Sequence, residues 1–374
     1  MSQTQHAQPT PAAQQTDFYL PILKNKSIAV VGNHSSLVIR DGENHHLVDF
    51  LLTENIQVKK VFAPEHGFRG MADAGSHIDD GVDSRTGLPI VSLHGVHRKP
   101  QDHDLQGIDL VVFDIQDVGV RFYTYIATLQ LVMQACAENQ IPIVVLDRPN
   151  PNGHYVDGPV MEKEHQSFLG MNPVPLVYGM TIGEYARMVN GEGWLGNDLK
   201  ANLTVIPLKN YTHQTPYKLP VKPSPNLPNA KAVNLYPSLG LFEGTNVNAG
   251  RGTDRQFQQF GASFLNAKAY DYSYTPRPMP GASSPKEMGK ICFGRDLSKT
   301  PYLNRINLQW LIEAYKQSED KSQFFINQGF TRHAGTEKLQ QQIIEGWSEA
   351  DIRRSWKADI ETFLAIRQRY LLYP

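Results

Sequence analysis

The chain has 374 residues, 40 % of them hydrophobic, and a formal net charge of −1 at pH 7. This length allows two domains, and the apolar fraction is large enough to bury a sizeable core. The balanced charge provides no broad basic field of the kind that binds nucleic acid or an anionic membrane, which leaves a local basic pocket for one small anion as the remaining electrostatic option.

Residues 1–20 are predicted to form a disordered tail, because positions 1–16 are rich in Gln, Ala, Thr and Pro and lack the apolar stretch of a signal peptide. No run of about 18 apolar residues occurs, so we expect no membrane span. The sequence as it stands predicts a cytoplasmic protein, or a periplasmic or secreted one if a leader has been removed. Cys136 and Cys292 are too few for a disulfide framework, and Cys136 is expected to be a buried free thiol.

Four short apolar runs predict buried strands, and they lie at residues 27–31, 58–62, 109–113 and 141–146. Between the third and fourth runs, residues 122–139 predict a helix, because apolar side chains recur there at three- and four-residue steps. Strand, helix and strand at this spacing imply a parallel sheet with right-handed crossovers. We therefore expect a Rossmann-like catalytic domain of the α/β class over residues 21–215.

Beyond these strands, Thr181 and Glu184 have the spacing of a capping box at the start of a further helix, and residues 203–207 are predicted to form a strand. Five prolines within residues 216–228 exclude a helix or a central strand there. We interpret this segment as the crossover into a second, smaller α/β domain over residues 229–374.

In the second domain, residues 270–286 predict a proline-rich loop, and residues 339–343 mark a helix that Gly346 ends. A last helix is expected to begin with Ser348 and Asp351 as its cap. The apolar face of this helix is predicted to carry Ile352, Trp356, Ile360, Phe363 and Tyr370.

Dense polar and glycine-rich sequence follows each of the four predicted strands. These segments are GNHSS (32–36), APEHGFRG (63–70), DIQDVG (114–119) and DRPNPNG (147–153). In an open α/β sheet, ligands bind beyond the carboxyl ends of the strands. The four segments are therefore expected to converge on one site at one edge of the sheet.

Carboxyl groups in these segments are the catalytic candidates. Glu65 directly follows a buried strand, where partial burial would raise the pKa of its carboxyl group and suit a general acid. A glycosidase needs a second carboxyl group, for which Asp114 and Asp117 are the candidates. The structural alternatives are that Glu65 caps a helix or pairs with Arg69, and that one aspartate binds loop amides or anchors Arg121.

Candidate substrate-binding side chains come from the same loops and from the second domain. They are His34, His66, Arg121, Tyr123, Arg148, Asn150, Asn152, Glu243 and Arg251. Arg121 and Arg148 could bind a substrate carboxylate, or they could only pair with Asp117 and Asp147.

Glu243 and Arg251 lie on glycine-rich turns of the second domain. Such residues could form a rim across an interdomain cleft, where ligands often bind, or they could form only an ion pair within a tight turn. A metal site is a further alternative, although no spacing in the sequence places three ligands together. Its possible ligands are His34, His66, His94 and Asp114.

The chain resembles the exo-β-N-acetylmuramidase family over nearly everything from Ile28 to Tyr373. The matching stretches are FAPEHGFRG (62–70), FDIQDVGVRFYTY (113–125), LDRPNPNG (146–153), DGPV (157–160), PSPNLP (223–228), LYPSL (235–239), FEGT (242–245) and GRGT (250–253). After the last motif the family usually has a proline before the phenylalanine, whereas this chain has Gln256-Phe257. This departure from the family pattern affects the expected rigidity of the loop and the expected substrate specificity of the site.

The resemblance implies a Rossmann-like domain and a smaller α/β domain with the active-site cleft between them. It implies release of N-acetylmuramic acid from the non-reducing ends of peptidoglycan fragments such as MurNAc-GlcNAc, with Glu65 of the PEHG motif as the catalytic residue and no metal or organic cofactor. The alternatives are a non-catalytic protein that binds a sugar or muropeptide, and a metal-dependent hydrolase.

A lactyl ether with a carboxylate distinguishes N-acetylmuramic acid from N-acetylglucosamine. An arginine is expected to recognise this carboxylate, because its guanidinium group binds carboxylates in a bidentate geometry. Of the arginines in the motif loops, Arg251 and Arg121 are the preferred candidates, and Arg148 is expected to pair with the adjacent Asp147.

Overall fold

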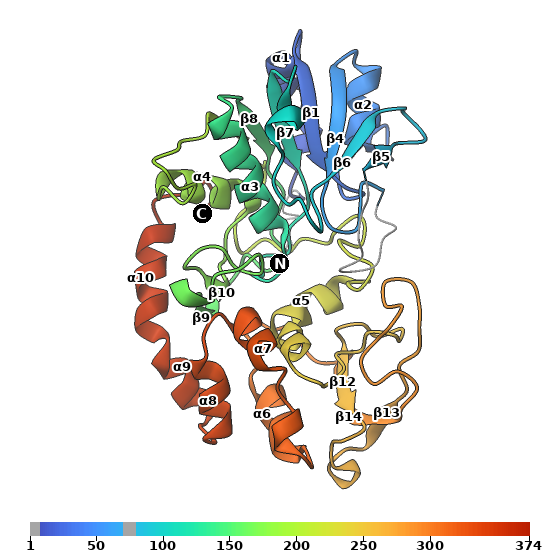
Figure 1. Cartoon of the computed structure of the whole chain (residues 1–374), viewed down its shortest axis with the longest axis vertical. Helices are drawn as coiled ribbons and strands as arrows, with labels where there is room; N and C mark the ends of the chain where they lie inside the picture. The colour runs from blue at the N-terminus through green and yellow to red at the C-terminus, as the bar shows by residue number, and fades with distance from the viewer. Residues whose placement is uncertain (1–7, 70–79) are drawn as a thin grey trace, which may run out of the picture.

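The computed structural model describes residues 8–69 and 80–374, which form an upper part built on a large sheet and a lower part of helices with a small sheet (Figure 1). The strands are β1 (Ser27–Gly32), β2 (Leu37–Arg40), β3 (Glu43–His46), β4 (Gln57–Ala63), β5 (Gly81–Val82), β6 (Pro89–Ser92), β7 (Leu110–Asp114), β8 (Ile143–Leu146), β9 (Asp157–Val160), β10 (Pro175–Val177), β11 (Leu203–Ile206), β12 (Gln259–Ala262), β13 (Tyr272–Tyr274) and β14 (Cys292–Asp296). The α-helices are α1 (Thr16–Leu23), α2 (Leu47–Thr53), α3 (Tyr125–Glu138), α4 (Ile182–Gly191), α5 (Ala230–Leu239), α6 (Gln309–Gln317), α7 (Asn327–Ala334), α8 (Lys338–Ile344), α9 (Glu349–Ser355) and α10 (Lys357–Arg367). Short 3-10 helices lie at Ala12–Gln14, Asp102–Leu105, Lys163–His165, Gly240–Gly244, Ala267–Ala269 and Lys321–Gln323.

The large sheet has the strand order β11-β8-β7-β1-β4-β6-β5. All neighbours are parallel except the edge pair β5 and β6. When the six parallel strands are numbered in chain order, their spatial order is 6-5-4-1-2-3, which is the order of a doubly wound Rossmann fold. The order reverses between β1 and β7, and ligands bind beyond the carboxyl ends of the strands at such a point.

Both faces of this sheet are buried, because successive residues of a strand point to opposite faces. In β1, Ala29 and Val31 belong to the core that includes α3 and α4, whereas Ile28 and Val30 belong to the core that includes α1 and α2. All four side chains are fully buried. Nearly continuous apolar strands of this kind are typical of parallel sheets that helices cover on both sides.

The predicted α/β fold with a Rossmann-like sheet is confirmed, and the five predicted strands are present as β1, β4, β7, β8 and β11. The helix expected over residues 122–139 begins later, at Tyr125, because the N–H group of Tyr123 bonds the carbonyl group of Val120 in a preceding turn. Thr181 and Glu184 form the predicted capping box at the start of α4.

Part of the predicted disordered tail is ordered. Residues 1–7 lie outside the described residues, but Thr10 forms a β-bridge with Lys209, and Tyr19 in α1 is fully buried. The Tyr19 hydroxyl group donates to the carbonyl oxygen of Ala13 at 2.8 Å. The composition of this segment did not predict its order, because contacts with distant residues hold it in place.

The second half contains the antiparallel sheet β12-β14-β13 and helices α5 to α9 (Figure 1). Strand β13 lies inside the predicted proline-rich loop of residues 270–286, so this segment is only partly irregular. The predicted last helix is two helices, α9 and α10, because the backbone at Trp356 leaves helical geometry, with φ −105° and ψ 5°. Tyr370 lies beyond the end of α10.

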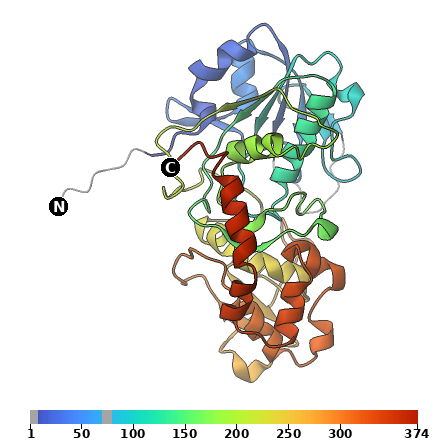
Figure 2. The same ribbon diagram turned by 90° about the vertical axis from the view of Figure 1, so that its left-hand side faces the viewer.

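Helix α10 runs from the lower part back toward the upper part (Figure 2). The hydroxyl group of Tyr373 then donates to Asp147 at 2.6 Å, so the end of the chain packs on the first domain. The domain limits predicted from the sequence, residues 21–215 and 229–374, stay a prediction. Within the described residues, no helix combines the length and the hydropathy needed to cross a membrane.

Candidate active site

The loops after β1 and β7 meet where the strand order reverses. Asn33 follows β1, and its amide group donates to the hydroxyl group of Tyr125 at 2.9 Å. The side-chain oxygen of Asn33 accepts hydrogen bonds from the backbone and the hydroxyl group of Ser35. Ser36 in turn bonds the backbone carbonyl group of Asp114, the last residue of β7. These bonds join the two loops to the start of α3, in agreement with the predicted convergence.

Glu65 lies two residues beyond β4 and is half-buried. Its carboxylate accepts a hydrogen bond from the hydroxyl group of Thr124 at 3.1 Å. Thr124 precedes the first residue of α3, so this helix positions the carboxylate. Arg69, the partner that the sequence offered for Glu65, instead pairs with Asp83. Its Nη2 lies 2.7 Å from the carboxylate of Asp83. Glu65 therefore combines a fixed position with partial exposure, as a proton donor to a bound ligand requires.

Three predicted ligand-binding residues, His34, His66 and Tyr123, contact the crossover segment. Their respective partners are the carbonyl oxygen of Lys222 at 2.8 Å, the hydroxyl group of Ser224 at 3.2 Å and the carbonyl oxygen of Pro223 at 2.7 Å. Burial lowers the pKa of His34, which favours its neutral ring. These contacts hold the crossover against the loops of the sheet, and the substrate contacts of the three residues stay a prediction.

Asp114 and Arg148 form a buried ion pair. Arg148 Nε lies 2.6 Å from Oδ1 of Asp114, Nη2 lies 2.8 Å from Oδ2, and the side chains are 2 % and 0 % exposed. The sequence interpretation paired Arg148 with Asp147, but Asp147 instead accepts hydrogen bonds from Thr181 and Gly183 at the start of α4. Because both oxygens of Asp114 are bound inside the protein, the structure gives this pair a scaffold position in place of the predicted catalytic and substrate-binding roles.

Asp117 differs from Asp114 because one of its oxygens has remaining acceptor capacity. Oδ2 accepts from the N–H group of Gly119 at 2.7 Å and from the hydroxyl group of Tyr178. Oδ1 is buried and has no hydrogen-bond partner among the described residues. Burial raises the pKa of Asp117 to about 6, although its hydrogen bonds oppose the shift. Of the two predicted aspartates, Asp117 is thus the better candidate for the second carboxyl group.

Arg121 is fully buried and binds backbone groups. Its guanidinium group donates to four carbonyl oxygens, which belong to Pro159, Val174, His333 and Ala334 at 2.7, 2.8, 3.1 and 2.6 Å. Neither predicted partner, the carboxylate of Asp117 or a substrate carboxylate, fits this position, because the guanidinium group is enclosed by protein. Arg121 therefore joins the two domains.

Asn150 and Asn152 are also part of the scaffold. Asn150 donates to the carbonyl group of Met180 at 2.8 Å, and Asn152 donates to the carbonyl groups of Val118 and Val233 at 2.9 and 3.1 Å. The two residues are 4 % and 0 % exposed, and their amide nitrogens are bonded within the protein, whereas the buried side-chain oxygen of Asn152 has no partner among the described residues. The contact of these residues with a sugar stays a prediction.

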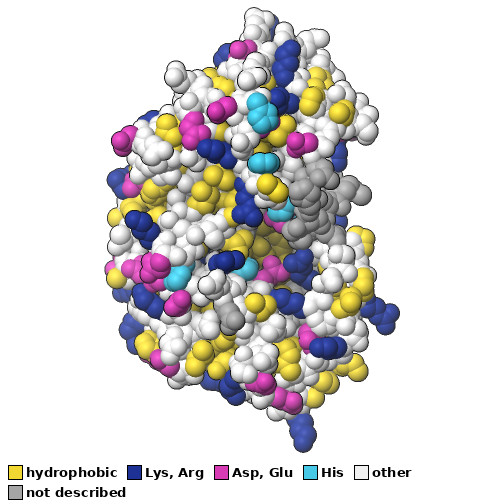
Figure 3. Space-filling model, in the orientation of Figure 1, with side chains coloured by type: hydrophobic (Ala, Val, Ile, Leu, Met, Phe, Trp, Pro, Cys, Tyr) yellow, Lys and Arg dark blue, Asp and Glu magenta, His cyan; other side chains and the backbone are white. Residues whose placement is uncertain are grey.

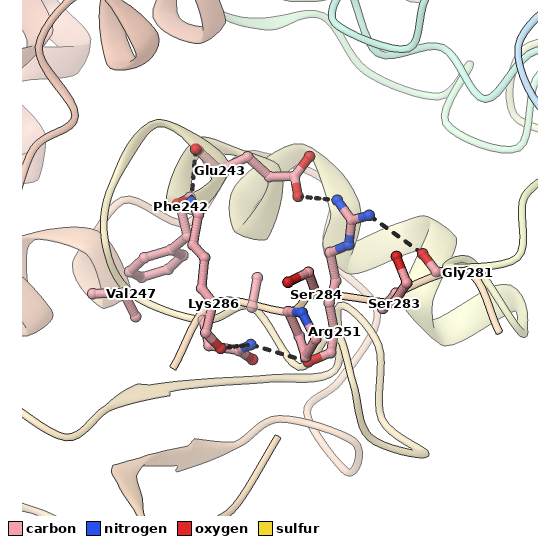
Figure 4. A pocket seen from close by; sticks show the side chains of 12 residues that line it. Phe242, Glu243, Val247, Arg251, Gly281, Ser283, Ser284 and Lys286 are labelled. Carbon is pink, nitrogen blue, oxygen red and sulfur yellow. Dashed lines mark hydrogen bonds and ion pairs between the residues drawn. The ribbon is translucent and has the colours of Figure 1, made fainter. Parts of the chain in front are cut away.

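Glu243 and Arg251 form an ion pair beside a cavity of about 290 Å³ in the second domain (Figure 4). Arg251 Nη1 lies 2.8 Å from Oε1 of Glu243, and about a quarter of each side chain is exposed. Burial disfavours ionisation of Glu243, but the neighbouring Arg251 leaves its pKa below the usual value. The predicted ion pair is therefore present, whereas a rim across an interdomain cleft stays a prediction, because the residues that line this cavity all belong to the second domain.

Lys286 closes another side of this cavity (Figure 4). Its ammonium group donates to the carbonyl oxygens of Phe242 and Glu243 at 3.1 and 2.8 Å. Burial lowers the pKa of Lys286 to about 8. Ser283 and Ser284 also line the cavity, so cationic and hydroxyl groups surround the Glu243–Arg251 pair.

The charge of Glu65 affects the pKa values of two groups in the second domain, Tyr236 and Arg251. Burial, followed by the charges of Glu243 and Glu65, raises the pKa of Tyr236 well above its usual value. Burial and Glu243 have the largest effects on the pKa of Arg251, and Glu65 adds to the upward shift. Contacts connect the same groups, because the Tyr236 ring packs on that of Tyr123, and the hydroxyl group of Tyr125 lies 3.5 Å from the carbonyl oxygen of Glu65. Figure 3 shows this face of the molecule hollowed at mid-height, with hydrophobic and charged side chains around the hollow.

Three residues that the sequence interpretation did not select contribute to this region, and they are Thr124, Tyr236 and Lys286. Tyr236 lies within the LYPSL motif and Thr124 within FDIQDVGVRFYTY, so the motifs themselves were the available signal. Lys286 lay at the end of a segment interpreted only as a loop.

The proposed metal ligands are separate in the structure. Among the residues described, the three-residue group with ligand atoms close enough to hold an ion is Glu162, Glu164 and His165 on the surface. His34, His66, His94 and Asp114 form no such group there, and Asp114 is bound by Arg148. The metal-dependent alternative therefore has no support from this geometry.

Two family models match the chain. The one described as Exo-beta-N-acetylmuramidase NamZ, N-terminal, covers residues 28–231, and the one described as Exo-beta-N-acetylmuramidase NamZ, C-terminal, covers residues 234–373. The chain is 36 % identical over 377 residues to the Peptidoglycan beta-N-acetylmuramidase NamZ of Bacillus subtilis (strain 168), a match that covers 95 % of this chain and 89 % of that protein.

Two crystal structures of DUF1343 family proteins from Bacteroides fragilis NCTC 9343 are also similar to the chain. One is 46 % identical with a TM-score of 0.89, and the other is 26 % identical with a TM-score of 0.79. Each match covers 98 % of this chain and 99 % of the solved chain, so the similarity includes both domains.

Proposed function

The chain belongs to the exo-β-N-acetylmuramidase family, and we propose that it is an exo-acting glycoside hydrolase that releases N-acetylmuramic acid from the non-reducing ends of peptidoglycan fragments such as MurNAc-GlcNAc. The observation that carries this proposal is the position of Glu65, two residues beyond β4 at the carboxyl edge of the Rossmann-like sheet, where the hydroxyl group of Thr124 at the start of α3 bonds its carboxylate at 3.1 Å. A carboxyl group on the first domain and a partly exposed guanidinium group on the second would supply a proton donor and a carboxylate receptor for one sugar.

In this proposal, Glu65 protonates the oxygen of the scissile glycosidic bond while an oxocarbenium-like centre forms on the sugar. The bond with Thr124 orients the carboxyl group. We assign the second carboxyl group to Asp117, as a base or as a group that orients the 2-acetamido substituent, because Asp117 retains an oxygen without a partner among the described residues.

Arg251 is proposed to recognise the lactyl carboxylate of N-acetylmuramic acid. Its guanidinium group is partly exposed beside the cavity, whereas those of Arg121 and Arg148 are buried. Glu243 would hold Arg251 in position from the other side, and the serines of the cavity wall would bind neutral oxygens of the ligand. The enclosed arginines leave Arg251 as the best candidate of those named from the sequence.

The test is hydrolysis of para-nitrophenyl β-N-acetylmuramide and of MurNAc-GlcNAc by the wild-type protein and by Glu65→Gln. On MurNAc-GlcNAc we expect the variant to lose roughly 10²- to 10⁴-fold in kcat, the usual contribution of general acid catalysis, and on the para-nitrophenyl glycoside we expect a smaller loss because its leaving group needs little protonation. Glu43→Gln, which changes an exposed glutamate of the same domain, is the matched control and should retain activity. Unchanged turnover of MurNAc-GlcNAc by Glu65→Gln would remove this residue from the mechanism, and stable binding of the disaccharide by the wild type without product would favour a binding protein.

A further inference from the structure

Tyr236 is held rigidly at the boundary between the two domains. It belongs to α5, and its ring packs against the rings of Phe122, Tyr123 and Phe257, with centroid distances of 5.1, 6.0 and 4.8 Å. The interplanar angles are 89°, 84° and 83°, and 7 % of the residue is exposed. Edge-to-face contacts on three sides fix the ring, and they therefore fix the direction of its hydroxyl group.

The packing around the Tyr236 ring leaves no space for a side chain at position 240, which is a glycine. A Cβ atom added at Gly240 would lie 2.4 Å from the Phe122 ring and 3.3 Å from the Tyr236 ring. The glycine after α5 thus allows Phe122 of the first domain to reach Tyr236 of the second. This contact places the Tyr236 hydroxyl group at a defined position relative to both domains.

The Tyr236 hydroxyl group forms no hydrogen bond with any residue in the ranges 8–69 and 80–374. Its neighbours differ in this respect, because the hydroxyl group of Tyr123 donates to Pro223 and that of Tyr125 accepts from Asn33. The oxygen of the Tyr236 hydroxyl group is not fully buried, unlike those of Tyr155 and Tyr270, so a bound ligand can reach it. A fixed hydroxyl group without a partner in the protein is therefore suited to a ligand.

Ring contacts connect Tyr236 to the loop of Glu65. Tyr236 packs on Tyr123, Tyr123 packs on Tyr125 at 4.8 Å, and the hydroxyl group of Tyr125 lies 3.5 Å from the carbonyl oxygen of Glu65. Burial has the largest effect on the pKa of Tyr236, and the carboxylates of Glu243 and Glu65 raise it further, while Arg251 opposes them. Burial and two nearby carboxylates disfavour the phenolate, so the hydroxyl group keeps its proton at neutral pH. It is consequently available there as a hydrogen-bond donor.

We propose that the Tyr236 hydroxyl group donates a hydrogen bond to an oxygen of the terminal sugar bound between Glu65 and the Arg251–Glu243 pair, which makes Tyr236 a catalytic residue supplied by the second domain. This assignment rests on the proposed function, since it requires a sugar in that position. It gives the second domain a direct part in the reaction, because the donor reaches the sugar only while the two domains keep their observed arrangement.

The experiment compares Tyr236→Phe with the wild type on MurNAc-GlcNAc. Phenylalanine keeps the three ring contacts, so the melting temperature should not change. The loss of one hydrogen bond that strengthens as charge develops should lower kcat by roughly 10- to 150-fold, with a smaller change in KM. The matched control is Tyr155→Phe, because the Tyr155 hydroxyl group is also without a partner among the described residues but lies near Asp157 and Arg353. This control should retain full activity.

A second measurement separates the failure of this assignment from the failure of the proposed function. Calorimetry with MurNAc-GlcNAc is carried out on Glu65→Gln and on the double variant Glu65→Gln/Tyr236→Phe, where no turnover interferes. Weaker binding by the double variant supports the contact even if the wild type releases no product. Equal binding together with unchanged kcat in Tyr236→Phe overturns the assignment, and so does a parallel loss of activity and melting temperature, which would indicate a structural role alone.

Discussion

Arg121 Nη2 lies 2.6 Å from the backbone carbonyl oxygen of Ala334, although the two residues are 213 positions apart in the chain. The same guanidinium group also donates to Pro159 and Val174 in the first half of the chain. A planar guanidinium group presents several donors in a fixed fork, so it can bind carbonyl groups of both domains at once. This residue therefore fixes how the second domain sits on the first, and with it the distance between Glu65 and the Arg251–Glu243 pair.

Arg121→Met should lower the free energy of unfolding by about 3 kcal/mol or more, because it leaves several buried carbonyl groups without donors. Urea denaturation measures this change. Arg40→Met is the control, since Arg40 forms an exposed pair with Glu54 that is expected to contribute less than about 1 kcal/mol. Activity toward muramic acid and glucosamine substrates should fall together in Arg121→Met. A selective loss of the muramic substrate would restore the role that the sequence predicted for Arg121.

Arg251→Ala should discriminate between the two sugars. If Arg251 binds the lactyl carboxylate, the loss of a charge-assisted hydrogen bond lowers kcat/KM for the muramic substrate by roughly 10- to 150-fold. The glucosamine analogue lacks this carboxylate and should be nearly unaffected. Arg255→Ala removes a neighbouring arginine that instead pairs with Asp296, and it is the matched control. An equal loss for both sugars in Arg251→Ala would mean that the guanidinium group serves the fold of the cavity.

His46 should lower the folding stability of the protein at acidic pH. Its Nε2 lies 2.9 Å from the carbonyl oxygen of Asn33, and its Nδ1 accepts from the N–H group of Val48 at 3.2 Å, an arrangement that requires the neutral ring. Burial, followed by the charge of Arg69, lowers the pKa of His46 from 6.5 to about 4. The unfolded chain therefore takes up this proton at a higher pH than the folded chain does.

The stability that neutral His46 provides should be fully present above pH 6.5 and should be lost as the pH falls toward 4. The shift corresponds to about 3 kcal/mol over this interval. Chemical denaturation at a series of pH values measures the slope, and His46→Gln, which does not titrate, should show a flatter dependence. If the wild type and this variant have the same slope between pH 6.5 and 4, His46 is not the group responsible.

Local patterns in the sequence were sufficient to predict much of the first domain. The apolar runs of β1, β4, β7 and β8 identified a parallel sheet, because burial on both faces requires nearly continuous apolar residues. Thr181 and Glu184 identified the start of α4, because a capping box depends on residues three positions apart. The motif segments at the strand ends predicted where a site would lie, since the carboxyl ends of parallel strands share one edge of the sheet.

Only the tertiary structure decided which of the polar residues have partners inside the protein. Arg148 pairs with Asp114 on the adjacent strand rather than with its sequence neighbour Asp147, because the partner of a charged group depends on which strand ends lie side by side. Arg121 satisfies four carbonyl groups from distant segments, and Tyr236 leaves its hydroxyl group unbonded within the described chain. Sequence spacing determines contacts across a few residues, whereas burial and long-range hydrogen bonds arise only once the two domains have packed together.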